Sequence, residues 1–377
     1  MPKFLAVIFF ALMLISSCSD EAGGSGSQNS GSQNSGSQNS ASQNNELSFD
    51  RKSLYYFVQK DSLLRFNCKG AQSMDLIELY INNQKAETWT NPTSDNFETL
   101  ISLDMGIYSI EIRGYKKSKF ISADDRRLMV NASIPPKDVN FELLSTHPHD
   151  SRNFTQGYEF NNGNLFESTG NPNNDGSTKV AEINQKTGIS IREKSQPNPI
   201  FGEGITILGN KVYQISWQNQ KCFVYDLNTF EMDTSFIYYG EGWGLCNDGK
   251  YIIMSNGTHE LVYRDPNNFS VIKSLSVHTD RALVTNLNEL EFCEGYIYAN
   301  IWTGEQRQQQ DGRIDLSKIV RIDSSTGTVD GIIDIRELID KSLKRGVPNG
   351  IAFRKTNNTF WLTGKYWNEA YEISINP

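Results

Sequence analysis

The chain has 377 residues, of which 11% are aromatic, and a formal net charge of −8. This length allows two or three domains with a sizeable core, and the aromatic content favours strands over helices. The negative charge argues against a nucleic-acid partner, because binding to phosphates needs an excess of basic side chains.

Residues 1–18 have the pattern of a bacterial lipoprotein signal peptide. Lys3 precedes an apolar run, residues 4–15, that is too short to cross a bilayer as a mature helix. The stretch Leu14-Ile15-Ser16-Ser17-Cys18 matches the lipobox, in which small residues precede a cysteine that is lipidated. We therefore expect a lipid anchor at Cys18 and a place in the bacterial cell envelope, facing either the periplasm or the exterior. An ordinary signal peptide that contains a cysteine by chance is the alternative.

Residues 19–45 form a low-complexity segment of Gly, Ser, Gln and Asn, in which the unit Gly-Ser-Gln-Asn-Ser recurs. This composition has almost nothing apolar to bury, so it predicts a flexible tether between the anchor and the folded chain. We assign the tether no function beyond reach.

Residues 46–135 have the pattern of a small all-β domain. The clearest strands are predicted at residues 54–58, 63–66, 76–81, 97–101 and 108–112. Several of them alternate apolar and polar residues, as half-buried antiparallel strands do. Roughly seven strands in this length favour an immunoglobulin-like β-sandwich, which the pair Pro135-Pro136 closes. The segment contains no catalytic constellation, so we expect it to act in spacing or contact.

Residues 139–377 repeat a pattern of three short strands five times. The units open near residues 157, 204, 242, 290 and 350. A spacing of roughly 40 to 60 residues between such units predicts a five-bladed β-propeller. The run before each new unit would supply the fourth strand of a blade, and residues 139–144 would supply it for the last unit. Only residues 334–345 have helical spacing.

The predicted blades bring chemically useful side chains to one face of the propeller. The first two strands of a blade are antiparallel, so the start of the first and the end of the second lie on the same side. These places hold polar side chains and three tryptophans, a combination typical of a ligand pocket. The residues are Phe154, Gln156, Phe201, Glu203, Trp217, Trp243, Asn288, Trp302, Asn349 and Lys365.

Glu203 and Lys365 are the titratable members of this face. Glu203 lies between Gly202 and Gly204, and we expect the glycines to let a substrate approach the acid closely. A carboxyl group desolvated by Phe201 and the tryptophans should have a raised pKa, which suits proton transfer near neutral pH. A tight turn with a solvated carboxylate is the alternative that the local sequence leaves open.

The histidines and cysteines show no metal-binding pattern. The four histidines form no HxxxH pair, and no two cysteines have CxxC spacing. We therefore expect neither a metal nor a cofactor, and no Ser-His-Asp nucleophile. The sequence leaves open whether the cysteines other than Cys18 are buried thiols or form a disulfide. They are Cys68, Cys222, Cys246 and Cys293.

Eight stretches, in order along residues 147–373, resemble the plant-type glutaminyl cyclases of plants and bacteria. They read Phe154-Thr155-Gln156-Gly157, Glu167-Ser168-Thr169-Gly170, Phe201-Gly202-Glu203-Gly204-Ile205-Thr206, Glu241-Gly242-Trp243-Gly244-Leu245, Leu287-Asn288-Glu289-Leu290-Glu291, Tyr298-Ala299-Asn300-Ile301-Trp302, Asn349-Gly350-Ile351-Ala352 and Leu362-Thr363-Gly364-Lys365. The resemblance implies a five-bladed propeller that cyclises the N-terminal glutamine of peptides or proteins to pyroglutamate. Ammonia is released and no metal is needed. We expect a monomer.

The resemblance also implies roles for individual residues. Glu203 would carry a proton from the attacking α-amine to the leaving amide nitrogen. Lys365, Asn288 and Trp302 would hold the γ-carboxamide and stabilise its oxyanion. The other residues of the face would line the pocket and bind the N-terminus of the substrate. These are Phe154, Gln156, Phe201, Trp217, Trp243 and Asn349.

Three features depart from the family pattern. The loop at residues 171–176 is longer than usual, and Asn256 and Asn368 replace an expected Asp and Pro. These differences put loop shape and peptide selectivity in doubt rather than the chemistry. Two other interpretations stay open. One is a non-catalytic envelope propeller that binds peptide or glycan, and the other is a propeller hydrolase with a metal in its channel.

Overall fold

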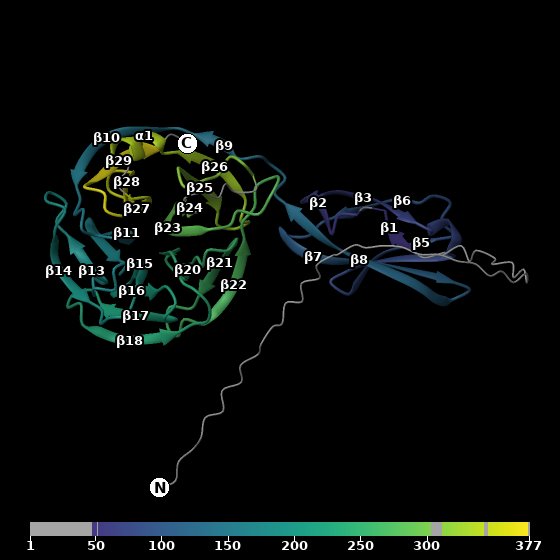
Figure 1. Cartoon of the computed structure of the whole chain (residues 1–377), viewed down its shortest axis with the longest axis horizontal. Coiled ribbons are helices and arrows are strands. Elements are labelled where there is room, and N and C mark those ends of the chain that lie inside the picture. The colour runs from purple at the N-terminus through teal and green to yellow at the C-terminus, as the bar shows by residue number, and fades with distance from the viewer. Residues whose placement is uncertain (1–46, 51, 303–310, 343–345, 376–377) are drawn as a thin grey trace, which may run out of the picture. The chain divides into compact units, whose positions relative to one another are not determined.

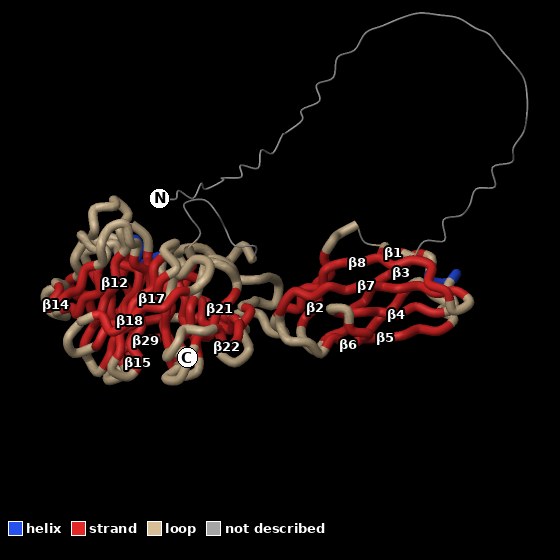
Figure 2. The backbone as a smooth tube through the Cα atoms, turned by 90° about the horizontal axis from the view of Figure 1, so that it is seen from below, coloured by secondary structure: helices blue, strands red, loops and turns tan. Residues whose placement is uncertain are grey.

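The computed structural model describes residues 47–50, 52–302, 311–342 and 346–375. Within these ranges nearly all regular structure is β-strand, as Figure 2 shows, so the all-β prediction is confirmed. The one α-helix in them, α1 (Arg336–Lys341), lies inside the predicted helical stretch and is shorter. No helix in the described part is long and apolar enough to cross a membrane. The predicted signal peptide with Cys18, and the tether, lie outside the described residues.

The first described segment folds into two sheets that share an apolar core. One sheet has the order β2 (Tyr55–Gln59), β8 (Lys119–Asn131), β7 (Gly106–Lys116), β4 (Leu76–Ile81), β5 (Gln84–Thr90), and the other β1 (Ser48–Phe49), β3 (Ser62–Lys69), β6 (Asn96–Ile101). Leu79 of β4 and Phe66 of β3 belong to the same buried cluster. Two sheets around one core are what a sandwich requires. That these sheets form an immunoglobulin-like sandwich stays a prediction, as does the domain boundary, which falls between β8 and β9.

Five further sheets contain the repeat units, and in three of them all strands follow chain order. The other two each include a strand, β9 or β10, from before the first unit. The first three sheets run from β11 (Thr155–Asn161) to β14 (Ser190–Ser195), from β15 (Gly202–Leu208) to β18 (Met232–Ile237), and from β19 (Leu245–Asn247) to β22 (Val271–Ser276). The fourth sheet runs from β23 (Leu287–Cys293) to β26 (Val329–Asp334) and adds β9 (Lys137–Val139). The fifth sheet contains β27 (Pro348–Arg354), β28 (Thr359–Gly364), β29 (Glu369–Ile375) and β10 (Phe141–Pro148). The intervening strands are β12 (Asn164–Thr169), β13 (Lys179–Ile183), β16 (Lys211–Ser216), β17 (Lys221–Asp226), β20 (Ile252–Met254), β21 (Glu260–Arg264), β24 (Tyr296–Ile301) and β25 (Lys318–Asp323).

The first strands of these sheets contact one another in a closed order, β11, β15, β19, β23, β27 and back to β11. Figure 1 shows the five sheets arranged around this inner ring. The arrangement is consistent with the predicted propeller of five blades. It places the start of every first strand close to the centre.

The fifth sheet takes its fourth strand from the other end of the region, as predicted. β10 pairs antiparallel with β29, so that Phe141 lies opposite Ile375 and Pro148 opposite Glu369. The strand predicted at 139–144 runs from Phe141 to Pro148, and Val139 belongs instead to β9 of the fourth sheet. Closure of the ring in this way removes an exposed sheet edge.

The four cysteines of the described part are buried free thiols, so none of the disulfides left open by the sequence forms among them. Burial raises the pKa of the Cys68 and Cys293 thiols to about 12. Thiols of that kind are packing groups rather than nucleophiles.

Candidate active site

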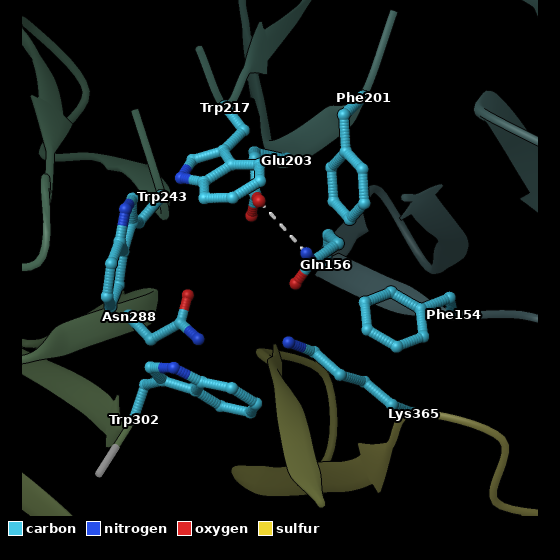
Figure 3. Close-up of a pocket in the computed structure, with 9 residues that line it drawn as sticks. All are labelled: Phe154, Gln156, Phe201, Glu203, Trp217, Trp243, Asn288, Trp302 and Lys365. Carbon is cyan, nitrogen blue, oxygen red and sulfur yellow. Dashed lines mark hydrogen bonds between the residues drawn. The ribbon is translucent and has the colours of Figure 1, made fainter. Parts of the chain in front are cut away.

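Nine side chains line a cavity of about 150 Å³ at the centre of the five sheets (Figure 3). They are Phe154, Gln156, Phe201, Glu203, Trp217, Trp243, Asn288, Trp302 and Lys365. All nine were singled out by their expected place at the start of a first strand or the end of a second strand. The tenth, Asn349, does not line the cavity. Among the residues described, no group of three or more His, Cys, Asp and Glu is arranged to hold a metal ion.

The three polar groups from first strands project from irregularities in the strand pairing. The register shifts between Thr155 and Gly157 in β11, between residues 202 and 205 in β15, and between residues 287 and 290 in β23. A bulge adds a residue to one strand and re-aims its side chain. Gln156, Glu203 and Asn288 occupy these places.

The glycines beside Glu203 allow close packing between neighbouring segments, which the sequence does not predict. A methyl group added at Gly204 would collide with the backbone of Gly244 and Leu245, which belong to the neighbouring blade. One added at Gly202 would lie 2.7 Å from the carbonyl oxygen of Thr169. Gly204 therefore allows β15 to approach the neighbouring blade, and Gly202 fits against the end of β12. The expectation that the glycines also admit the substrate stays a prediction. Glu203 itself lies within β15 and not in a turn.

The Glu203 carboxyl group is held inside the cavity with little water. Glu203 is 5% exposed, and Gln156 Nε2 donates a hydrogen bond of 3.0 Å to Glu203 Oε1. Burial raises the pKa of Glu203 well above its ordinary value, while the charge of Lys365 lowers it and that of Glu241 raises it. A carboxyl group with a raised pKa can both accept and return a proton near neutral pH.

Lys365 enters the cavity from the end of β28 and is also 5% exposed. Its Nζ lies 4.3 Å from the ring centre of Trp302 and 4.7 Å from that of Phe154. Burial lowers the pKa of Lys365 to about 8, with Glu203 acting in the opposite direction. The two rings stabilise the ammonium through their π faces, where water would otherwise do so.

Aromatic rings form the wall on the other side. The ring of Phe201 lies between those of Phe154, at 6.0 Å, and Trp217, at 5.7 Å, measured between centroids. Trp217 is 37% exposed and marks the mouth of the cavity. Tyr366, which the sequence did not single out, packs against Phe154 with centroids 5.3 Å apart.

Asn349 supports the cavity from behind. It is fully buried, and its Nδ2 donates to Gln156 Oε1 at 2.8 Å and to the Thr155 carbonyl oxygen at 3.0 Å. Because the oxygen of the Gln156 amide is occupied in this way, its nitrogen faces Glu203. In this structure Asn349 orients Gln156, and its Oδ1 has no partner among the described residues. Its predicted contact with the substrate stays a prediction.

Asn288 offers an unused hydrogen-bonding group to a ligand. It is buried, and its Oδ1 has no partner among the described residues. Ser255 Oγ holds the backbone by donating to the Asn288 carbonyl oxygen at 2.6 Å, and Ser168 Oγ does the same for Glu203 at 2.5 Å. A buried acceptor without a partner is costly, so its retention beside a cavity indicates a binding group.

Comparisons with known proteins point to one family. A sequence profile described as glutamine cyclotransferase matches residues 121–375, which include every cavity residue. A glutaminyl-peptide cyclotransferase of Arabidopsis thaliana is 34% identical over 242 residues, covering 62% of this chain and 71% of that protein. The crystal structure of Myxococcus xanthus glutaminyl cyclase is similar with a TM-score of 0.57 and 28% identity, covering 64% of this chain and 98% of the other.

Proposed function

The chain belongs to the glutamine cyclotransferase family of plant and bacterial type, and from this premise we propose that it is a glutaminyl-peptide cyclotransferase. It converts the N-terminal glutamine of peptides and proteins to pyroglutamate and releases ammonia. The observation that carries the proposal is the buried Glu203 in an aromatic cavity, hydrogen-bonded to Gln156 and facing Lys365.

The cavity suits one amino-acid residue at the end of a chain. Its volume is about 150 Å³, and the aromatic wall can pack against the methylene groups of a glutamine side chain. The side chain must fold back on its own α-amine to cyclise, and a narrow cavity favours that compact pose. Holding the two reacting groups together supplies a large part of the rate in an intramolecular reaction.

Glu203 moves the proton. As the α-amine nitrogen attacks the side-chain carbonyl carbon, the Glu203 carboxylate accepts a proton from that nitrogen. The same carboxyl group then donates the proton to the amide nitrogen, the carbon–nitrogen bond breaks, and ammonia leaves. One group with a raised pKa can serve both steps, because its proton affinity lies between those of the donor and the acceptor.

Lys365 and Asn288 stabilise the negative charge that forms on the carbonyl oxygen. The Lys365 ammonium and the Nδ2 group of the Asn288 amide are the donors, and both side chains border the cavity. Trp302 supports this side by covering the Lys365 ammonium.

We also propose that Cys18 is lipidated and holds a monomeric enzyme in the bacterial cell envelope.

The first test is ammonia release from a glutamine-initiated dipeptide, with pyroglutamate identified by mass spectrometry. We expect turnover by the wild type and a loss of about 10²- to 10⁴-fold in Glu203→Gln, because the amide cannot carry the proton. Glu142→Gln changes an exposed acid on β10 and serves as the matched control. Full activity of Glu203→Gln would refute the mechanism. No turnover by the wild type would favour a propeller that only binds peptide or glycan.

A further inference from the structure

Glu241 lies just before Trp243 and joins two walls of the cavity at its mouth. Its Oε2 accepts a hydrogen bond from Trp217 Nε1 at 2.8 Å and from Trp243 Nε1 at 3.0 Å. Its Oε1 accepts one from Gln218 Nε2 at 3.1 Å. Figure 3 shows the indole nitrogens of both tryptophans on the side where the two rings approach each other. One carboxylate therefore fixes the orientation of both rings.

The three hydrogen bonds leave the charge of Glu241 uncompensated. All three donors are neutral, and no Lys, Arg or His of the described residues forms an ion pair with it. Partial burial acts to raise the pKa of Glu241, but the hydrogen bonds outweigh it and hold the pKa below its ordinary value. Glu241 is thus a partly exposed anion at neutral pH.

A bound peptide must place its second residue near this anion. The cavity has room for the terminal glutamine only, so the next residue lies at the mouth, where Trp217 is exposed. Glu203 and Lys365 are both buried, whereas Glu241 is partly exposed. A fixed charge acts over about a Debye length, roughly 8 Å at physiological salt, which covers the side chain of a second residue.

We propose that Glu241 is a specificity-determining residue, which orients Trp217 and Trp243 and makes the enzyme prefer peptides with a basic second residue over those with an acidic one. This inference rests on the proposed cyclotransferase function. It concerns the choice among substrates and not the chemical step, which Glu203 performs.

The test compares kcat/KM for three dipeptide amides, Gln-Lys, Gln-Ala and Gln-Glu, which differ only in the second side chain. At low ionic strength we expect the wild type to favour Gln-Lys over Gln-Glu by about fivefold, the size of an interaction across water at the mouth. The ratio should approach one in Glu241→Gln, and it should shrink for the wild type in high salt. Glu142→Gln removes the same charge from an exposed place on β10 and should keep the wild-type ratio.

A second variant separates the charge from the support of the tryptophans. Glu241→Ala removes the acceptors of both indoles, so we expect KM to rise by a similar factor for all three peptides, in addition to the loss of the ratio. A wild-type ratio near one, or an unchanged ratio in Glu241→Gln, would overturn the inference while turnover of Gln-Ala upheld the cyclotransferase function. Absence of turnover with all three peptides would overturn both.

Discussion

Glu203 and Lys365 have proton affinities that approach each other. Burial moves the pKa of the acid up and that of the base down, so the two groups titrate much closer together than in water. In a pocket with aromatic walls this is the expected result, because both charged forms lose their hydration. A pair of this kind can pass a proton and stabilise an anion without a metal.

The pH dependence of kcat should follow from these two groups. Glu203 must be ionised to accept a proton, so kcat rises with pH through its raised pKa. Lys365 must be protonated to stabilise the oxyanion, so kcat falls as the pH passes about 8. Rates at saturating peptide across the pH range test this. Lys365→Arg stays charged and should lose the alkaline fall, though at a lower rate; an alkaline limb that persists in this variant would contradict the assignment.

Asn349 should affect turnover without touching the substrate. In Asn349→Ala the Gln156 amide is no longer fixed, and we expect kcat to fall about tenfold with little change in KM. Asn349→Asp should be worse, because its carboxylate repels Gln156 Oε1 and turns that oxygen towards Glu203. Asn357→Ala, in the exposed turn after β27, is the matched control. A rise in KM with an unchanged kcat would indicate direct binding instead.

At the scale of the elements, the strand irregularities explain what could and could not be read from the sequence. The order of strands and the ten positions follow from repeated apolar runs, and nine of the ten side chains meet in one cavity. The directions of Gln156, Glu203 and Asn288 depend on bulges, and a further bulge lies between Pro348 and Ile351 of β27. Apolar patterning does not reveal a one-residue insertion, so the sequence does not predict that Asn349 donates a hydrogen bond to Gln156. The hydrogen bonds from Trp217 and Trp243 to Glu241 are also not predictable from apolar patterning, because Glu241 lies in the loop before β19. The sequence does not predict β8, because the charged run Asp124, Asp125, Arg126 and Arg127 at its middle interrupts any apolar pattern.

The close approach of β15 and β19 predicts a large cost for a small change. Gly204→Ala should lower the free energy of unfolding by about 2 to 4 kcal/mol, because its methyl group meets the backbone of the next blade, which cannot move alone. Gly209→Ala provides the comparison, since its site is open and only its positive φ of 64° is unfavourable, at about 1 kcal/mol. Urea unfolding of both variants measures the difference. Equal losses would mean that β15 and β19 can separate.

At the scale of the whole molecule, the ring depends on residues from both of its ends. A chain that begins at Lys137 keeps β9 and β10, and we expect it to retain turnover of a small peptide. A chain that begins at Asp150 lacks β10, which leaves β29 as an open edge, and we expect aggregation or loss of cooperative unfolding. Light scattering and thermal unfolding distinguish the two. Turnover by the shorter chain would show that closure is dispensable.

The ladder between β10 and β29 also sets an order in time. Residues 141–148 can pair with residues 369–375 only after the second segment has been synthesised. More than 200 residues of chain separate the two segments. Contacts between such distant segments form slowly, because the entropy of closing the loop is lost before the contact contributes stabilising free energy. A growing chain can therefore build individual blades but cannot finish the ring until its last strand has been made. Gln156 and Lys365 come from the first and the last repeat unit along the chain. The cavity is consequently among the last parts of the protein to form.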